Sequence, residues 1–336
     1  MSLKPETIAP TVTLPRLDTL DVQHVSVRAA PLERSDTMVD DRSELAARLT
    51  SDGYVFLPGL LDRGLVLDVR GDVLDALDDQ GWLGPRPDRN DAVPGPRSLS
   101  DQDDAWWPGY IAVQRLEAFH QLAHAAPILD IVSTLLGGAP VLVQPHKIAR
   151  IRFPGPDQLT PPHQDFPFIQ GTCDVLTAWI PLGDCPAEMG PLRVLKGSHR
   201  HGFREHAALA GGGGMGLEID GQDPRWRSTD YRAGDVLVFS SLTIHDTAAN
   251  HGDRIRLSAD YRYQSALEPM NEGLVHPHAY PSVPDWDEIT QAWASTEWIS
   301  IPSSTPLVKA RFPDADLHPG ASRFTATSDA DTTHTG

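Results

Sequence analysis

The sequence predicts a mainly β core that is supported by α-helices. Helical patterns occupy the first part of the chain and short β-type segments follow them, which is not the alternation expected of βαβ units. Turn residues separate the β-type segments, and glycine and proline are abundant, with 27 and 30 of 336 residues. The combined share of glycine and proline exceeds the usual ~12% of a protein and favours a loop-rich fold over a helix bundle. With 40% hydrophobic residues, the chain can build a sizeable core.

The helical part follows a polar, proline-containing arm over residues 1–38. Apolar residues at three-to-four spacing indicate amphipathic helices, and a short apolar run that ends at a Pro-Gly turn indicates a buried strand. The predicted elements are, in order, a helix over 41–49, a strand over 54–57, a helix over 61–77, an irregular loop over 84–107 and two helices over 112–136 broken at Pro127.

The β-type part begins after a Gly-Gly pair that ends the last of these helices. Its segments occupy residues 141–153, 173–182, 235–240 and 255–263, and a last helix is expected over 285–298. From residue 325 the chain is small and polar, which predicts disorder. We therefore expect an arm over 1–38, a single domain over 39–300 with its β core at about 139–265, and a partly disordered extension over 301–336.

Charge and cysteine content exclude several classes of protein. The chain has 46 acidic and 28 basic residues and a formal charge of −18, which disfavours nucleic acid and anionic membranes as partners. Two cysteines, Cys173 and Cys185, are too few for a disulfide scaffold or a four-cysteine metal site. The N-terminal residues lack an apolar signal segment, and no apolar run is long enough to span a membrane. These features predict a cytoplasmic protein, and they leave its oligomeric state open between a monomer and a homodimer.

Two histidines and one carboxylate are placed so that they can share a metal ion. His163 and Asp165 are two residues apart, and in extended backbone such residues point to the same side. His245 follows the apolar strand over 235–240. Two imidazoles and one carboxylate leave three positions of a metal open, which is the usual ligand set of non-haem Fe(II) oxygenases.

An arginine lies where it can bind an α-keto acid at that metal. If a hairpin is centred between Asn250 and His251, His245 and Arg256 face each other across it. Arg254 lies two residues before Arg256 and would point to the same face, so this geometry does not exclude Arg254 as the arginine that binds the α-keto acid. The distal carboxylate of an α-keto acid needs a buried cation, and the planar guanidinium binds carboxylates through two donors.

Four segments together resemble the phytanoyl-CoA dioxygenase family of Fe(II)/2-oxoglutarate-dependent oxygenases, which includes ectoine hydroxylase and bacterial secondary-metabolite hydroxylases. They are His163-Gln-Asp165 and the runs over 175–182, 190–202 and 234–263. The resemblance covers about residues 40–300. It implies that the β core is a double-stranded β-helix, a cupin-like jelly roll, with supporting helices, and that residues 39–300 form the oxygenase domain.

The resemblance also implies roles for individual residues. His163, Asp165 and His245 become the iron ligands, and Arg256 becomes the partner of the distal carboxylate of 2-oxoglutarate. Three further residues match family contacts to that co-substrate, namely Trp179, Thr247 and Gln144. The chain departs from the family in having lysine at position 196, where relatives have proline, in a corner that is structural. Because halogenating relatives replace the carboxylate, Asp165 argues against halogenation.

The implied function is hydroxylation of an unactivated C–H bond of a small-molecule metabolite, with O₂ consumed and 2-oxoglutarate converted to succinate and CO₂. The same chemistry can end in desaturation, epimerisation or ring closure, and a non-catalytic jelly-roll binding protein is the other alternative. Five aromatic residues are candidates for walls of the substrate pocket, although core packing explains three of them equally well; they are Phe166, Phe168, Trp106, Trp107 and Tyr110. Arg150 and Arg152 could meet an anionic substrate, but we expect them to lie on a solvated strand face.

Overall fold

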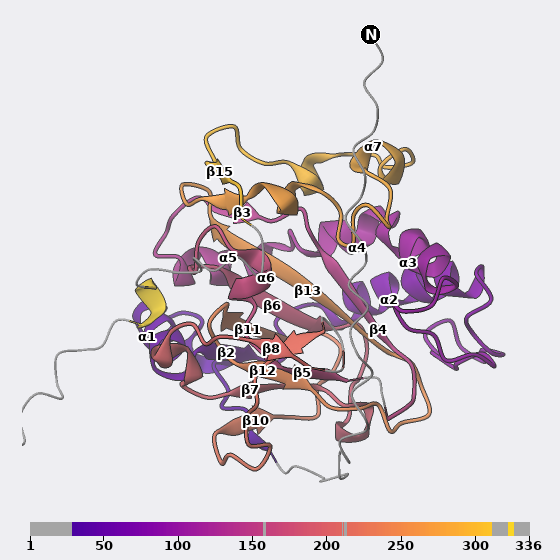
Figure 1. Ribbon diagram of the computed structural model, residues 1–336, viewed down its shortest axis with the longest axis horizontal. Coiled ribbons are helices and arrows are strands. Elements are labelled where there is room, and N and C mark those ends of the chain that lie inside the picture. The colour runs from indigo at the N-terminus through magenta and orange to yellow at the C-terminus, as the bar shows by residue number, and fades with distance from the viewer. Residues whose placement is uncertain (1–28, 157–158, 210, 212–213, 311–321, 326–336) are drawn as a thin grey trace, which may run out of the picture.

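Two β-sheets face each other and share no strand, and they confirm the predicted mainly β core (Figure 1). The computed structural model describes residues 29–156, 159–209, 211, 214–310 and 322–325. The five-stranded sheet consists, in spatial order, of β1 (Ala30–Pro31), β10 (Trp226–Ser228), β7 (Leu192–Leu195), β12 (His245–Thr247) and β5 (Thr160–His163). The six-stranded sheet consists of β2 (Tyr54–Leu57), β11 (Val236–Ser240), β6 (Leu176–Pro181), β13 (Arg256–Ser265) and β3 (Val141–Val143), with β4 (Ile148–Arg152) also paired to β13.

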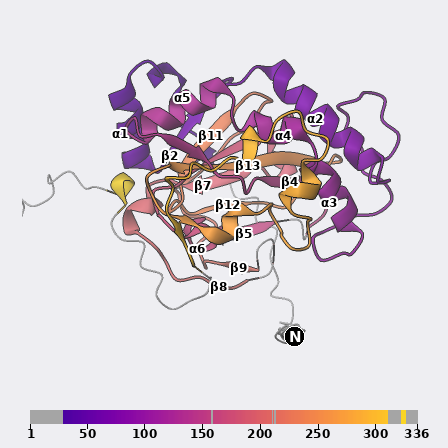
Figure 2. The same cartoon turned by 90° about the horizontal axis from the view of Figure 1, so that it is seen from above.

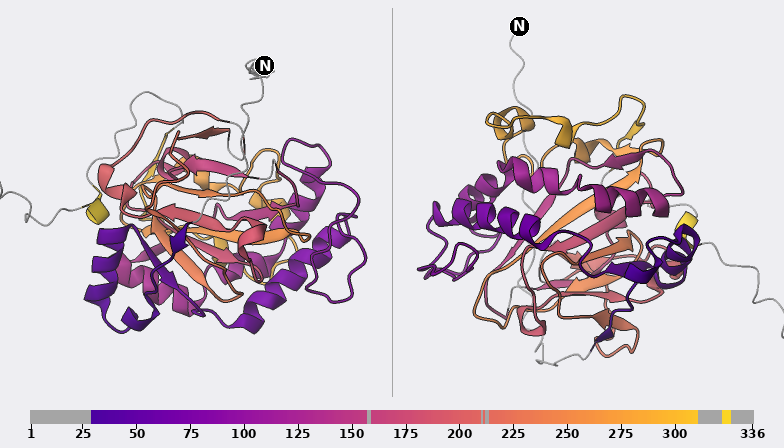
Figure 3. Two further views of the ribbon diagram at one scale, coloured as in Figure 1. Left: turned by 90° about the horizontal axis from the view of Figure 1, so that it is seen from below. Right: turned by 180° about the vertical axis from the view of Figure 1, so that it is seen from behind.

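Five helices cover the outer face of the six-stranded sheet (Figures 2 and 3). They are α1 (Arg42–Asp52), α2 (Arg63–Asp78), α3 (Trp106–Gln114), α4 (Glu117–Leu122) and α5 (Ala126–Leu135). Short elements complete the described fold: α6 (Phe166–Ile169), α7 (Trp286–Ile289), β8 (Ala207–Ala208), β9 (Met215–Gly216), β14 (Met270–Asn271) and β15 (Leu307–Val308). No helix among the described residues is long and apolar enough to cross a membrane.

Local sequence signals explain where the helices begin and end. The Asp41 side chain accepts hydrogen bonds from the backbone N–H groups of Ser43 and Glu44, which caps the N-terminus of α1. Gly53 ends the same helix at a φ of 83°, a conformation that glycine adopts without strain. Pro127 lies in the first turn of α5, where proline is tolerated, so it begins that helix and does not break a longer one.

Strand β13 separates two environments because its side chains alternate between the two faces of the sheet. Leu257, Ala259 and Tyr261 pack with the helices in the largest hydrophobic cluster. The even-numbered side chains, which begin with Arg256, point between the sheets. The interior on that side is therefore polar: Arg256, Ser258, Asp260, Arg262 and Gln264 are all buried there.

Two sequence predictions about elements are wrong. The expected helix over 285–298 is reduced to α7 and a 3-10 turn at Glu297–Ile299. The expected hairpin does not form, because β12 pairs with β5 and β7 whereas β13 pairs with β3, β4 and β6 in the other sheet. The Asn250 side chain donates to the backbone carbonyls of Arg152 and Arg254, at 3.0 and 2.8 Å, and so directs the connection across the sandwich. Disorder was predicted from residue 325 onward; Thr325 ends a 3-10 turn that begins at Arg323, and the later residues lie outside the described part of the chain.

Candidate metal centre and co-substrate cavity

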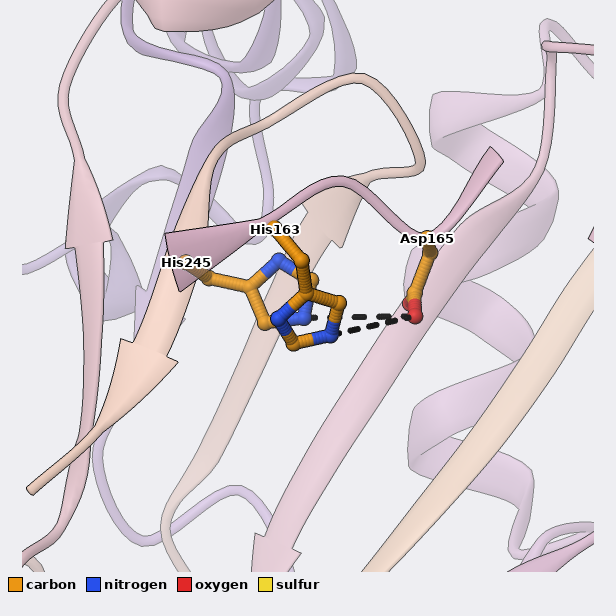
Figure 4. Close-up of side chains that lie close together, drawn as sticks. All are labelled: His163, Asp165 and His245. Carbon is orange, nitrogen blue, oxygen red and sulfur yellow. Dashed lines mark ion pairs between the residues drawn. The ribbon is translucent and has the colours of Figure 1, made fainter. Parts of the chain in front are cut away.

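Three buried side chains meet at one point: two flank the junction of β5 and α6, and the third comes from β12 (Figure 4). His163 ends β5 and is paired directly with His245 of β12, so the two imidazoles lie side by side on the inner face of the sheet. Asp165 follows after a turn. The Nε2 atoms of His163 and His245 lie 4.0 and 3.9 Å from Oδ1 of Asp165. This spacing is suited to a single metal ion between the three atoms.

Asp165 reaches the cluster by a different route from the one the sequence suggested. Its φ of −71° and ψ of −30° are helical, because the chain turns into α6 directly after His163. The alternation of side chains along an extended strand therefore does not explain the direction of the Asp165 side chain. The tight turn between β5 and α6 brings the carboxylate to the same side as the imidazoles.

The hydrogen bonds of the two histidines prepare both rings for metal binding. Nδ1 of His163 lies 2.9 Å from the carbonyl oxygen of Pro161, and Nδ1 of His245 lies 2.9 Å from that of Thr243. A carbonyl oxygen only accepts, so Nδ1 carries the proton in each ring and Nε2 presents a lone pair. Burial and the neighbouring His245 hold the pKa of His163 well below its ordinary value, which keeps that ring neutral.

The carboxylate of Asp165 is held by two side chains that the sequence analysis missed. Thr177 donates a 2.6 Å hydrogen bond to Oδ2, and Arg262 donates a 3.0 Å hydrogen bond to Oδ1. Burial alone would raise the pKa of Asp165, but Arg262, the two histidines and the Thr177 hydroxyl lower it well below its ordinary range. The carboxylate is therefore charged and oriented, and this donor set of two neutral imidazoles and one carboxylate fits Fe(II).

A small cavity beside the cluster brings together several of the predicted site residues. Its lining includes both histidines together with Thr160, Trp179, Thr247 and Arg256. Arg256 is buried, and its Nη1 donates to the carbonyl oxygen of Gly190. Arg254, which the sequence left as an alternative, instead pairs with Asp91 and Asp253 near the surface. His245 and Arg256 thus share a cavity from opposite sheets.

Three other residues do not lie where the sequence predicted. Gln144 is buried but is not among the cavity residues, and its Nε2 donates a 2.7 Å hydrogen bond to Gln264. Arg150 and Arg152 do not form a solvated strand face, because β13 and its polar inner face lie beside them. Nε of Arg150 donates to Asp260 at 2.7 Å, and Nη2 of Arg152 donates to the Thr160 hydroxyl at 3.1 Å.

The candidate substrate aromatics divide into two groups. The ring of Phe168 lies 5.9 Å from that of His163, beside the metal cluster, and Phe166 packs in a small cluster next to it. Trp106 and Tyr110 belong to the core under the helices, and Trp107 packs against that core. None of these five residues is among those lining the cavity.

A sequence signal for the missed residues was available in the strand alternation. Thr177 lies two positions before Trp179 on β6, and Arg262 lies six positions after Arg256 on β13. An even separation along a strand places side chains on one face. Once Trp179 and Arg256 were assigned to the interior, the same parity predicted Thr177 and Arg262 there.

The chain is similar to known proteins in sequence and in fold. The phytanoyl-CoA dioxygenase (PhyH) family matches residues 50–258. Two curated relatives are 1-deoxypentalenic acid 11-beta-hydroxylases. The one from Streptomyces exfoliatus is 29% identical over 246 residues, and the one from Streptomyces arenae is 30% identical over 249, each covering 68% of this chain and 83% of the relative. A solved non-heme monooxygenase, ThoJ in its apo form, has a similar fold, with a TM-score of 0.50 and 21% identity over 66% of this chain and 77% of that chain.

Proposed function

The chain belongs to the phytanoyl-CoA dioxygenase family, and we propose that His163, Asp165 and His245 hold the Fe(II) of a 2-oxoglutarate-dependent hydroxylase. The protein is a non-haem iron oxygenase whose cofactors are Fe(II), 2-oxoglutarate and O₂. When bound, iron couples the oxidative decarboxylation of 2-oxoglutarate to succinate and CO₂ with the hydroxylation of a C–H bond. Residues 39–300 make up the catalytic domain in this proposal.

One observation carries the proposal: the buried cluster opens onto the same cavity as an arginine that has no carboxylate partner among the described residues. Nε2 of His163, Nε2 of His245 and Oδ1 of Asp165 converge, so a metal bound there leaves positions open toward the cavity. Arg256 would hold the distal carboxylate of a 2-oxoglutarate molecule whose keto-acid end lies at the metal. A metal-free binding protein would not need this arrangement.

Other cavity residues orient the co-substrate and exclude water from it. Trp179 forms part of the wall on the six-stranded sheet, and Thr247 presents a hydroxyl from β12 on the opposite side. Gln144 is left out of this set because it bonds to Gln264. Phe168, beside His163, is the aromatic residue best placed at the substrate side of the metal.

The substrate in this proposal is a small-molecule metabolite of secondary metabolism. Support comes from the Streptomyces relatives, which hydroxylate 1-deoxypentalenic acid. A cytoplasmic location fits the same proposal because a reducing compartment keeps iron ferrous, and both cysteines are buried thiols. The protein acts as a monomer or a homodimer.

The proposal is tested by anaerobic absorption spectroscopy. Wild-type protein with Fe(II) and 2-oxoglutarate should develop a weak visible charge-transfer band. His163→Ala and Asp165→Ala should lose the band while they keep the far-UV circular dichroism of the wild type. His201→Ala, which removes an exposed histidine, is the matched control and should keep the band. A full band in either ligand variant contradicts the assignment, and no band in folded wild-type protein favours a non-catalytic binding protein.

The outcome of the reaction is read from product mass. Candidate metabolites that stimulate succinate release identify the substrate. A product heavier by one oxygen atom indicates hydroxylation. A product lighter by two hydrogen atoms indicates desaturation or ring closure, and an unchanged mass with altered stereochemistry indicates epimerisation.

A further inference from the structure

Two buried arginines lie next to each other on the inner face of the six-stranded sheet. Arg152 of β4 is paired directly with Arg256 of β13, so both side chains emerge on the same side. Their exposed fractions are 8% and 2%. The sequence suggested a solvated strand face for Arg152, with contact to an anionic substrate as the alternative, and the proposed function assigns it no role.

Neither arginine has a carboxylate partner among the described residues. Arg256 donates to the carbonyl oxygen of Gly190, Arg152 donates to the Thr160 hydroxyl, and Nε of each is buried without a partner. The other arginines with side chains in this interior are compensated, since Arg150 pairs with Asp260 and Arg262 pairs with Asp165. The two adjacent arginines therefore have no ion-pair partner of their own, since Asp260, the carboxylate that attracts both, is paired with Arg150.

Such an arrangement is costly unless an anion completes it. A buried charge without a partner loses its hydration and gains nothing in return. Burial and the neighbouring arginines lower the pKa of Arg152 to about 9, because both disfavour the charged form of its guanidinium. A carboxylate between the two guanidinium groups would remove much of it.

The threonines next to the arginines are arranged to donate to that anion. The Thr160 hydroxyl oxygen accepts from Arg152 at 3.1 Å, and the Thr247 hydroxyl oxygen accepts from the backbone N–H of Thr160 at 3.2 Å. Because these contacts use the acceptor side of each oxygen, both hydroxyl protons can turn elsewhere. Both threonines line the cavity that also contains Arg256.

We propose that Arg152 is a positioning residue for the distal carboxylate of 2-oxoglutarate, to which it adds a second positive charge and orients the hydroxyl of Thr160. This inference rests on the proposed function. Arg256 and the two threonine hydroxyls contact the carboxylate, and Arg152 stands behind Thr160. The chain thereby holds a dicarboxylic co-substrate more strongly than one arginine alone would.

Binding measurements with two keto acids test the inference without turnover. The probes are 2-oxoglutarate and 2-oxopentanoate, which has the same keto-acid end and chain length but lacks the distal carboxylate. Each is titrated anaerobically into the Fe(II) protein and followed by the charge-transfer band. Arg152→Gln should weaken 2-oxoglutarate binding by about ten-fold or more, the usual loss for a charge-assisted contact, and change 2-oxopentanoate binding by less than about two-fold.

Matched variants separate this role from a structural one. Arg152→Lys keeps the charge and should recover most of the lost affinity, whereas Arg254→Gln removes a surface arginine and should bind both keto acids as the wild type does. Thr160→Val leaves Arg152 in place and should show the same selective loss for 2-oxoglutarate. It supplies the test if Arg152→Gln does not fold.

Distinct outcomes overturn the inference and the proposed function. Arg152→Gln that binds 2-oxoglutarate as tightly as the wild type, or that loses both keto acids equally, overturns the role of Arg152 alone. Wild-type protein that binds neither keto acid overturns the proposed function as well. The thermal midpoint without ligand should not fall in Arg152→Gln, because the substitution removes an uncompensated buried charge.

Discussion

Arg262 donates a 3.0 Å hydrogen bond to Oδ1 of Asp165, the same oxygen that lies near both histidine nitrogens. Thr177 fixes the other oxygen of that carboxylate. Both partners come from the six-stranded sheet, whereas the two histidines come from the five-stranded sheet. The metal cluster therefore depends on the packing of the two sheets against each other.

Arg262→Gln should weaken Fe(II) binding by about 10- to 100-fold, the usual effect of removing a group that orients a metal ligand. The glutamine is too short to hold Oδ1 of Asp165, so the carboxylate can rotate away from the histidines. The dissociation constant is measured by anaerobic competition between Fe(II) and a fluorescent chelator.

Arg63→Gln is the control for this variant, because it removes an exposed arginine of α2 that pairs with Asp184. It should bind Fe(II) as the wild type does. An Arg262→Gln protein with wild-type circular dichroism and wild-type metal affinity would show that the Asp165 carboxylate needs no such support.

Much of the fold followed from local patterns in the sequence. The helix over 41–49 and the strand over 54–57 appear as α1 and β2 because capping by Asp41 and the turn at Gly53 are local signals. The helix over 285–298 failed because its packing surface is made by distant parts of the chain. Trp286, for example, donates to the carbonyl oxygen of Val275, and Trp293 donates to that of Arg115.

The site was predicted in part. His163, His245 and Arg256 do approach a common cavity. The hairpin argument for His245 and Arg256 was nevertheless wrong, because strand parity says on which face a side chain lies but not which strands pair. Contacts such as those of Asn250 with Arg152 and Arg254 decide which sheet each of β12 and β13 joins. Arg152 is distant from Asn250 in the sequence, and Arg254 lies outside any strand pattern.

Gly190→Ala should destabilise the protein by roughly 3 kcal/mol and also weaken 2-oxoglutarate binding. Gly190 has a φ of 64°, and a Cβ there would collide with the carbonyl oxygens of Ala248 and Ala249 just after β12. The loop would have to shift, and with it the carbonyl oxygen that holds Arg256. Urea unfolding gives the loss in the free energy of unfolding, and the keto-acid titration gives the loss in affinity.

Gly137→Ala is the matched control for the backbone conformation. Gly137 also has a positive φ, of 69°, but a Cβ there meets no atom within 4 Å. This variant should lose only about 1–2 kcal/mol, the cost of the conformation itself, and keep its affinity for 2-oxoglutarate. Equal losses of stability in the two variants would show that the contact with Ala248 and Ala249 does not matter.

Lys147 is fully buried immediately before β4. Its ammonium donates a 2.6 Å hydrogen bond to the carbonyl oxygen of Trp298 and has no carboxylate partner among the described residues. Burial lowers the pKa of Lys147 from 10.5 to about 7. Between these values the unfolded state binds the proton and the folded state does not, so the free energy of unfolding rises with pH by at most ~1.4 kcal/mol per pH unit.

Lys147→Met should therefore stabilise the protein by roughly 1–3 kcal/mol at pH 6, and the gain should shrink as the pH rises from about 7 toward 10.5. The carbonyl oxygen of Trp298 keeps a partner, since Nε2 of His124 lies 3.1 Å from it. Urea unfolding at pH 6, 8 and 10 measures the difference, and Lys309→Met, at an exposed lysine, should show none. A stability difference that stays constant across this range would mean that Lys147 keeps its ordinary pKa. The cost of burying the charge would then be met elsewhere in the fold.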